Sequence, residues 1–358
     1  MNPEGNDASF DNPVNGSDGA VQGSPETRVA ERVDVTFIGG GPVGLFGACC
    51  AGLHSMSAKI IEALPHLGGQ PAALYPEKYI YDVPAFPKIL AKDLIANLIE
   101  QAMQFDPVVC TGERALELRG DVERGFEVVT DRGVHPTRTV ICTVGLGAFV
   151  PRRLGVPGEE RFEGRGVHYF VTRLADFRER RVLIVGGGDS AVDWALALAP
   201  LAASVVLVHR RGTFRAQENS VETLFASPVD VRLFHEVRRI EGDDCVRRVV
   251  LAENRSGEET TLEVDAVILA LGFTPDLGPV STWGFDLNED RIRVATTGET
   301  SIPGVFAAGD AVDYPGKLKL IAGGFGEVAT AVAQAKRYVD PKARLQIHSS
   351  NLTFVGKA

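Results

Sequence analysis

The chain has 358 residues, of which 44% are hydrophobic and 23% are charged, with 37 Lys and Arg against 47 Asp and Glu. This length corresponds to about two domains, and the composition is that of a globular protein rather than a disordered or fibrous one. The formal net charge of −10 disfavours nucleic acid as a partner. Five Cys with no CxxC pair exclude a disulfide scaffold and a CxxC-type zinc ribbon. We expect no metal site, and a reducing, cytoplasmic location.

The N-terminal segment and one uncharged stretch need separate interpretation. Residues 1–30 are rich in Asn, Asp, Gly, Pro and Ser and contain no apolar core, which predicts a disordered tail rather than a signal peptide. Residues 35–53 carry no charge, but they are rich in glycine and contain Pro42. They divide into a strand-like half and a helix-like half, so we expect no membrane-spanning helix.

One pattern occurs twice along the chain. Residues 33–40 read as a strand, followed by a glycine turn, a helix and a second strand at 58–62. Residues 181–187 begin the same series, which ends with a strand at 204–211. Each is a βαβ unit of about 30 residues, as dinucleotide binding requires. The sequence therefore predicts an α/β protein with two doubly wound nucleotide-binding domains.

Two apolar strands mark the domain boundaries. Residues 140–147 and 265–276 each form an apolar run that ends in a glycine turn and is followed by proline. We expect the chain to leave the first domain, build the second and return. This predicts a tail at 1–30, a first domain at 31–148 and 277–358, and an inserted second domain at 149–276.

The first glycine motif contains Gly39, Gly41 and Gly44 in the GxGxxG spacing. Such a turn lets the backbone approach a diphosphate at a helix N-terminus, where free N–H groups and the helix dipole favour anions. Glu62 ends the next strand, where a carboxylate accepts hydrogen bonds from ribose hydroxyls and would repel a 2′-phosphate. This site is expected to take FAD or NAD rather than NADP, although a solvated strand-end Glu62 is an alternative.

The second glycine motif has Gly186, Gly188 and Ala191 in a GxGxxA variant. Its second strand ends in His209, Arg210 and Arg211, where an acidic residue would otherwise stand. Guanidinium groups bind phosphate through bidentate, charge-assisted hydrogen bonds. We therefore expect NADP(H) here, with an ordinary basic surface turn as the alternative.

A third element, residues 296–310, is an apolar strand that ends in Gly309 and Asp310. Asp310 is suited to bind a hydroxyl of a flavin's ribityl or diphosphate side. The alternative is that Asp310 caps a helix beginning near Ala322.

These motifs resemble those of the thioredoxin-reductase-like flavoproteins. The segments ALYPEKYIYDVPAFP (73–87), HYFV (168–171), HRRGTFRA (209–216) and PKARLQIHSS (341–350) are similar to the bacterial ferredoxin–NADP⁺ reductases of that type. The similarity extends over residues 33–352 and implies FAD and NADP(H) as cofactors.

The sequence departs from thioredoxin reductase in one respect. In that enzyme a CxxC precedes the second glycine motif, whereas here residues 164–169 are followed by Phe170, Val171 and Thr172. Disulfide chemistry needs a thiolate pair. The five cysteines are expected to be small buried residues, so that electrons leave directly from the flavin.

The resemblance also implies particular FAD contacts: Glu62, Gln70, Tyr75, Ala115, Phe149, Asp310 and Ser350. By the same resemblance, Tyr75 stacks on one face of the isoalloxazine. His348 covers the other face from the partner subunit of a homodimer.

The function implied is hydride transfer between NADPH C4 and flavin N5, then single-electron transfer to ferredoxin or flavodoxin. The cofactor carries this chemistry, so no acid or base is nominated. The alternatives are reduction of a thioredoxin-like protein or of oxygen, and a non-catalytic protein that senses FAD and NADP.

An acidic electron carrier would need a local basic face on this acidic chain. The candidates are cations of both domains: Arg152, Arg153, Arg173, Arg178, Arg180, Arg181, Lys317, Lys319 and Lys336. The alternative is that these charges are scattered and only favour solubility.

Overall fold

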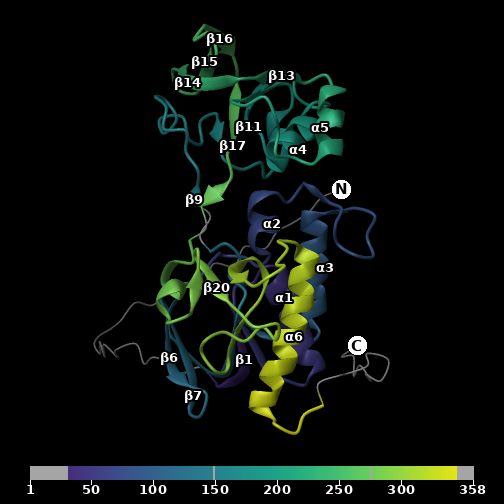
Figure 1. The fold of residues 1–358 in the computed structure, drawn as a ribbon, viewed down its shortest axis with the longest axis vertical. Coiled ribbons are helices and arrows are strands. Elements are labelled where there is room, and N and C mark those ends of the chain that lie inside the picture. The colour runs from purple at the N-terminus through teal and green to yellow at the C-terminus, as the bar shows by residue number, and fades with distance from the viewer. Residues whose placement is uncertain (1–30, 148–149, 275, 345–358) are drawn as a thin grey trace, which may run out of the picture.

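The computed structural model of the 358-residue chain describes residues 31–147, 150–274 and 276–344. Two domains follow one another along the long axis (Figure 1). Two short strands connect them: β9 (Val150–Pro151) pairs antiparallel with β18 (Phe273–Thr274). The outgoing and returning segments of the chain therefore run side by side. The predicted α/β class with two doubly wound domains is confirmed.

The first domain is built on a seven-stranded sheet in which β1 is central to the parallel part. β1 pairs with β2 on one side and with β8 on the other, and β6 and β7 extend β8 as an antiparallel meander. The strands are β1 (Val33–Ile38), β2 (Ala58–Glu62), β5 (Val108–Thr111), β6 (Ala115–Asp121), β7 (Gly125–Thr130), β8 (Val134–Cys142) and β21 (Val305–Ala307).

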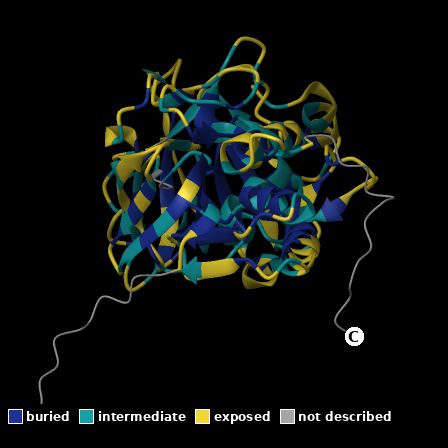
Figure 2. Cartoon of the chain, turned by 90° about the horizontal axis from the view of Figure 1, so that it is seen from below, coloured by how far each residue is buried: buried dark blue, intermediate teal, exposed yellow. Residues whose placement is uncertain are grey.

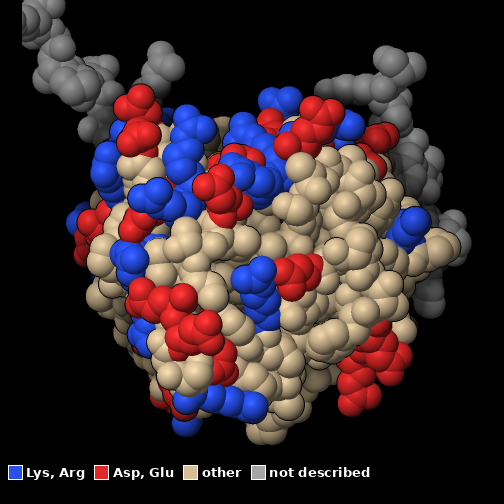
Figure 3. Space-filling view, turned by 90° about the horizontal axis from the view of Figure 1, so that it is seen from above, with Lys and Arg blue, Asp and Glu red and all other residues tan. Residues whose placement is uncertain are grey.

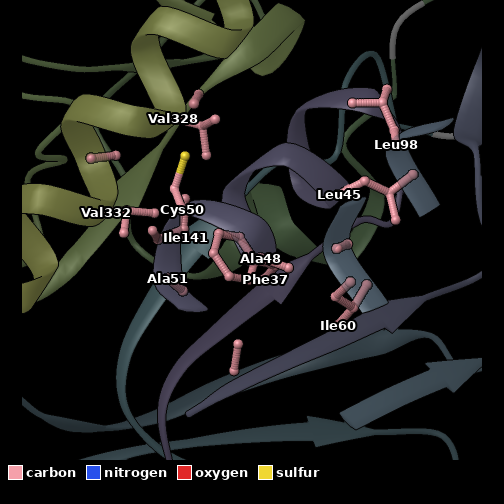
Figure 4. Close-up of a cluster of buried hydrophobic side chains, with 14 of the residues drawn as sticks. Phe37, Leu45, Ala48, Cys50, Ala51, Ile60, Leu98, Ile141, Val328 and Val332 are labelled. Carbon is pink, nitrogen blue, oxygen red and sulfur yellow. The ribbon is translucent and has the colours of Figure 1, made fainter. Parts of the chain in front are cut away.

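Three helices cover one face of this sheet: α1 (Pro42–Leu53), α3 (Ala91–Met103) and α6 (Ile321–Val339). Phe37 and Ile60 point from the strands into the cluster, where Leu45 and Val328 meet them from α1 and α6 (Figure 4). The uncharged stretch at residues 35–53 thus forms most of the buried strand β1 and the whole of helix α1. Among the described residues, no helix is long and apolar enough to cross a membrane.

The second domain has a five-stranded, fully parallel sheet in the order β10–β17–β11–β12–β13. Alternate strand residues face two separate cores: Ile184 points toward helix α4, and Leu183 points toward a small antiparallel sheet. The elements are β10 (Val167–His168), β11 (Arg181–Gly186), α4 (Asp189–Leu198), β12 (Ser204–His209), α5 (Glu218–Phe225), β13 (Asp230–Leu233), β14 (His235–Gly242), β15 (Val246–Glu253), β16 (Glu259–Glu263) and β17 (Ala266–Ala270).

Short elements complete the chain. They are α2 (Gly69–Leu74), β3 (Tyr79–Ile80), β4 (Ile89–Leu90), β19 (Leu287–Asn288), β20 (Arg291–Arg293) and β22 (Val312–Asp313), with 3₁₀ turns at Leu174–Phe177, Gly278–Thr282 and Gly309–Ala311. Figure 2 shows the buried residues concentrated along the strands and on the inner faces of the helices.

Candidate functional site

The first glycine turn joins β1 to α1. Gly39 has φ +106°, and a Cβ there would lie 2.5 Å from the carbonyl oxygen of Thr143, so only glycine fits. Gly44 is packed against the carbonyl of Gly39 with no room for a side chain. Gly41 is the N-cap of α1 and makes no side-chain cap. A Cβ placed at Gly41 would lie 3.8 Å from the Cα of Gly69, its nearest contact. The free N–H groups of α1 and the adjacent space fit a diphosphate.

Glu62 lies at the end of β2, beside this turn, and is buried. Its Oε2 accepts a hydrogen bond from the Gly40 N–H at 2.7 Å, and its Oε1 accepts one from the Leu64 N–H at 2.8 Å. Burial raises the pKa of Glu62 above its ordinary value, although these two hydrogen bonds oppose the rise. Glu62 is therefore held at the cavity wall and is not the solvated strand-end acid of the alternative.

The second glycine turn joins β11 to α4. A Cβ at Gly186 would lie 2.5 Å from the carbonyl oxygen of Ala270 and 2.9 Å from the Cβ of Ala191, so both positions need small residues. Gly188 is the N-cap of α4, without a side-chain cap and with no other atom within 4 Å of a Cβ placed there. The turn thus has the same open N-terminus as the first.

Three arginines gather after β12. Arg210 and Arg211 are exposed, and Arg215 lies four residues beyond Arg211. The pKa of His209 is lowered by burial, and the positive charges of all three arginines lower it further. Arg215 was not among the predicted phosphate ligands, although the similar segment HRRGTFRA contains it.

His209 itself faces the protein interior. Its ring lies against Gly187 and stacks on Phe214 with centroids 5.2 Å apart. Its Nε2 is 3.0 Å from the carbonyl oxygen of Thr213. The histidine therefore supports the glycine turn from behind, while the guanidinium groups lie outside.

The third element ends at the turn that carries Asp310. Gly309 has φ +82°, and its N–H donates to Oε2 of Glu327 on α6 at 2.8 Å. Burial raises the pKa of Asp310. Helix α6 begins at Ile321 after Leu320 and has no side-chain cap, so the alternative that Asp310 caps this helix is wrong. Glu327, which also bonds Lys317, is a support for this turn that the motif did not indicate.

Tyr75 lies where the two domains meet. Its ring packs against the hydrophobic clusters of both domains. Burial raises the pKa of Tyr75 to about 12, with Asp310 and Asp82 contributing, so the phenol is neutral near pH 7. Its neighbours link the domains: the Leu174 N–H donates to Glu77 Oε2 at 2.7 Å, and Lys78 forms a salt bridge with Asp193.

A cavity of about 1620 Å³ connects these parts. From the first domain it is lined by the predicted residues Gly39, Gly41, Glu62, Gln70, Tyr75, Ala115 and Asp310. From the second domain it is lined by α4 and α5 residues, including Asp189, Asp193, Trp194 and Asn219. Gly186, Gly188, Ala191 and the basic cluster lie outside this lining. Phe149, His348 and Ser350 lie outside the described residues.

The cysteines do not form a redox pair. Burial raises the pKa of Cys49 to about 11 and that of Cys50 to about 12, and Figure 4 shows Cys50 among aliphatic side chains. Cys142 is buried as expected, but Cys110 and Cys245 are only half-buried, so the expectation of five buried cysteines is wrong for these two. The raised pKa values of Cys49 and Cys50, the two adjacent cysteines, disfavour the thiolate that disulfide exchange requires.

Four of the nine cations expected to form a basic face pair with a carboxylate among the described residues. Arg153 pairs with Glu163 at 2.9 Å and Arg181 with Asp265 at 2.8 Å, while the ammonium of Lys317 is buried against Glu327. Figure 3 likewise shows blue and red side chains intermixed on the face seen from the second domain. Arg173 also pairs, with Asp176. Within the described part of the chain, the other five candidates make no salt bridge: Arg152, Arg178, Arg180, Lys319 and Lys336.

The site and fold define a class of protein that binds two nucleotides. Residues 33–335 match the family model of the pyridine nucleotide-disulphide oxidoreductases, and the chain belongs to this family. Among curated proteins, it is 50% identical over 321 residues to ferredoxin–NADP reductase of Geobacillus thermodenitrificans, with 89% of this chain and 97% of that protein covered. It is also 50% identical over 320 residues to ferredoxin–NADP reductase 2 of Bacillus subtilis, with 89% and 96% covered. The chain therefore belongs with the ferredoxin–NADP reductases.

Solved structures agree on the architecture. The thioredoxin reductase of T. acidophilum superposes with a TM-score of 0.77 at 25% identity, over 87% of this chain and 99% of that one. Lactococcus lactis thioredoxin reductase in its FR conformation gives 0.75 at 29% identity, over 86% and 99%. Similarity to these proteins was predicted from the motifs and is confirmed.

Glu62 generates a prediction about FAD affinity and pH. Ribose hydroxyls donate to an ionised carboxylate, and the pKa of Glu62 in the apoprotein is raised by burial. FAD affinity should therefore fall as the pH drops through this raised pKa, at a higher pH than for an ordinary glutamate. The measurement is titration of apoprotein with FAD by fluorescence quenching at a series of pH values.

A Glu62→Gln variant provides the control. It should bind FAD roughly tenfold or more weakly near pH 7, because a hydrogen bond to a charged group contributes about 1.5–3 kcal/mol. Its affinity should also lose this acid-side pH dependence. An unchanged affinity and pH profile in this variant would contradict the role of Glu62.

Proposed function

We propose that the chain is an FAD-containing ferredoxin–NADP⁺ reductase that passes electrons between NADPH and ferredoxin. The observation that carries this proposal is the single cavity that reaches from the first glycine turn and Asp310 to helices α4 and α5 of the second domain. FAD, when bound, supplies hydride acceptance from NADPH and release of electrons one at a time. The chain has no thiol pair to act between flavin and acceptor.

The protein's own contribution is to bind and orient two nucleotides. We assign FAD to the domain formed by 31–148 and 277–358, and NADP(H) to residues 149–276. The FAD residues are Gly39, Gly41, Gly44, Glu62, Gln70, Tyr75, Ala115, Phe149, Asp310 and Ser350. The NADP(H) residues are Gly186, Gly188, Ala191, His209, Arg210 and Arg211, to which we add Arg215 because its charge acts on His209 together with theirs.

The acceptor is tested by comparing turnover with different carriers. NADPH should reduce cytochrome c slowly with the enzyme alone and much faster when ferredoxin is added. Flavodoxin, oxidised thioredoxin and oxygen are assayed in parallel, and a faster reaction with one of them would replace ferredoxin as the acceptor. Slow flavin reduction by NADPH in stopped flow would instead support a nucleotide-sensing protein.

The basic cluster predicts nucleotide preference. Replacing both Arg210 and Arg211 with Ala should raise the NADPH KM at least about tenfold, because each charge-assisted hydrogen bond contributes roughly 1.5–3 kcal/mol. The NADH KM should be nearly unchanged, since NADH has no 2′-phosphate. Arg247→Ala, an exposed arginine on β15, is the matched control. Equal losses with both nucleotides would argue against a 2′-phosphate site.

We further propose a cytoplasmic homodimer in which the C-terminal tail of one subunit completes the flavin site of the other. Support comes from the segment PKARLQIHSS, which is similar to that of the ferredoxin–NADP⁺ reductases. Helix α6 ends at Val339, and described chain continues to residue 344. His348 would then cover the flavin face opposite Tyr75 and shield it from water and oxygen.

Deleting residues 345–358 tests the role of the tail. The truncated protein should keep its fold and its FAD, but its flavin absorption spectrum should change and its NADPH oxidase rate with oxygen should rise. Subunit exchange is tested by mixing this variant with a Tyr75→Ala variant and looking for partial recovery of activity in the heterodimer. If the deletion leaves spectrum, oxidase rate and turnover unaltered, His348 has no place in the site.

A further inference from the structure

A short segment joins the two protein groups assigned to the adenosine half of FAD. It runs from Gly112 to Ala115, between the end of β5 and the start of β6. The Glu113 N–H donates to the carbonyl oxygen of Glu62 at 3.0 Å, and the Gly112 N–H donates to that of Leu64 at 2.7 Å. The segment is therefore fastened by its backbone to the end of β2, where the Glu62 carboxylate lies.

The side chain of Glu113 points the other way, into the protein. It is only 7% exposed, and its Oε1 accepts hydrogen bonds from Thr130 Oγ1 at 2.5 Å and from His135 Nε2 at 2.6 Å. The thiol of Cys110 also bonds this carboxylate. The three partners come from β7, β8 and β5, so one carboxylate links three strands behind the cavity wall.

The surroundings keep this carboxylate ionised. Burial raises the pKa of Glu113, but the hydrogen bonds from Thr130 and His135, and the charges of His135 and Arg132, outweigh burial and leave the pKa below its ordinary value. Lys59, which is 2% exposed on β2, adds a further positive charge nearby. A buried, charged group with several hydrogen-bond donors holds its neighbours in one geometry, because losing a partner leaves the buried charge less well compensated.

We propose that Glu113 is a positioning residue for the adenosine half of FAD. Its carboxylate fixes residues 113–115 relative to Glu62, so that the Ala115 backbone and the Glu62 carboxylate bind the adenosine together. Glu113, Arg114 and Ala115 all line the cavity. Ala115 is also paired across the β6–β7 ladder with Thr130, which donates a hydrogen bond to Glu113. This pairing connects the hydrogen bonds of Glu113 to the strand that begins with Ala115. This inference rests on the assignment of FAD to the first domain.

The same cluster has the donor atoms of a metal site. One atom each of Cys110, Glu113 and His135 lies within 4.8 Å of the other two. The carboxylate, however, already accepts hydrogen bonds from the other two groups. Lys59 and Arg132 place positive charge beside it, which disfavours a cation. We therefore interpret the cluster as a hydrogen-bond hub, and metal retention is one outcome of the test.

The test compares Glu113→Gln with Glu117→Gln, a matched loss of an exposed carboxylate on β6. Apoprotein is titrated with FAD by fluorescence quenching and with ADP by competition against FAD. Glu113→Gln should weaken binding of both by the same factor, about tenfold, which corresponds to about 1.4 kcal/mol. Glu117→Gln should bind both like the parent protein. Flavin-loaded Glu113→Gln should keep its visible spectrum and its rate of flavin reduction by NADPH.

A second pair of variants separates positioning from loss of fold. Thr130→Val removes one donor to Glu113 and should also weaken FAD and ADP together, whereas Thr130→Ser keeps the donor and should restore both affinities. Unchanged affinities in Glu113→Gln and Thr130→Val would overturn the proposal. So would weaker FAD binding with unchanged ADP binding, or zinc retained stoichiometrically by the parent apoprotein and lost in Glu113→Gln. A parent apoprotein that binds neither FAD nor ADP would overturn the proposed function instead.

Discussion

The two-domain arrangement of the chain fits one requirement of hydride transfer: the nicotinamide must reach the flavin directly. Two βαβ units provide two helix N-termini with free N–H groups, at Gly41 and at Gly188. Each can bind a diphosphate, but neither alone brings the reacting rings together. In the proposed function the cavity between the domains is where they meet, because Tyr75 and Asp310 form its wall on one side and α4 and α5 form it on the other.

The contact between the domains includes polar pairs. Lys78 and Asp193 are each about 30% exposed or less as side chains, and Glu77 binds a backbone N–H of the second domain. Partly exposed ion pairs of this kind contribute little to stability. These polar contacts therefore add little to the free energy that holds the domains together. The two chain segments that connect the domains contain the short strands β9 and β18, which pair with each other. Because Tyr75 packs against both domains, a change in their relative position would also change the environment of the Tyr75 ring, which we assign to stack on the flavin.

Local signals account for what the sequence predicted well. The strand–turn–helix units follow from apolar runs and from glycines that no other residue can replace, such as Gly39 with φ +106°. The position of Glu62 follows from spacing alone. The supports of the site could not be found in this way, because Glu327 and Glu113 act through contacts with residues distant in sequence. The pairing of the candidate cations could not be found from the sequence for the same reason: the acidic partners of Arg153 and Arg181 are revealed only by the fold.

Glu62, Glu113 and Glu327 show three ways of using a carboxylate that is wholly or partly buried. Glu62 accepts two backbone N–H groups and retains lone pairs toward the cavity. Glu327 is turned away from the cavity and holds the Gly309 turn, with Tyr314 and Lys317 as its other partners. Glu113 joins strands behind the adenosine wall. In the proposed function, a bound nucleotide would contact groups whose positions are already fixed by these hydrogen bonds, so that little ordering of the protein would remain on binding. Acidic residues that contribute to the negative net charge are, at these positions, the framework of the nucleotide site.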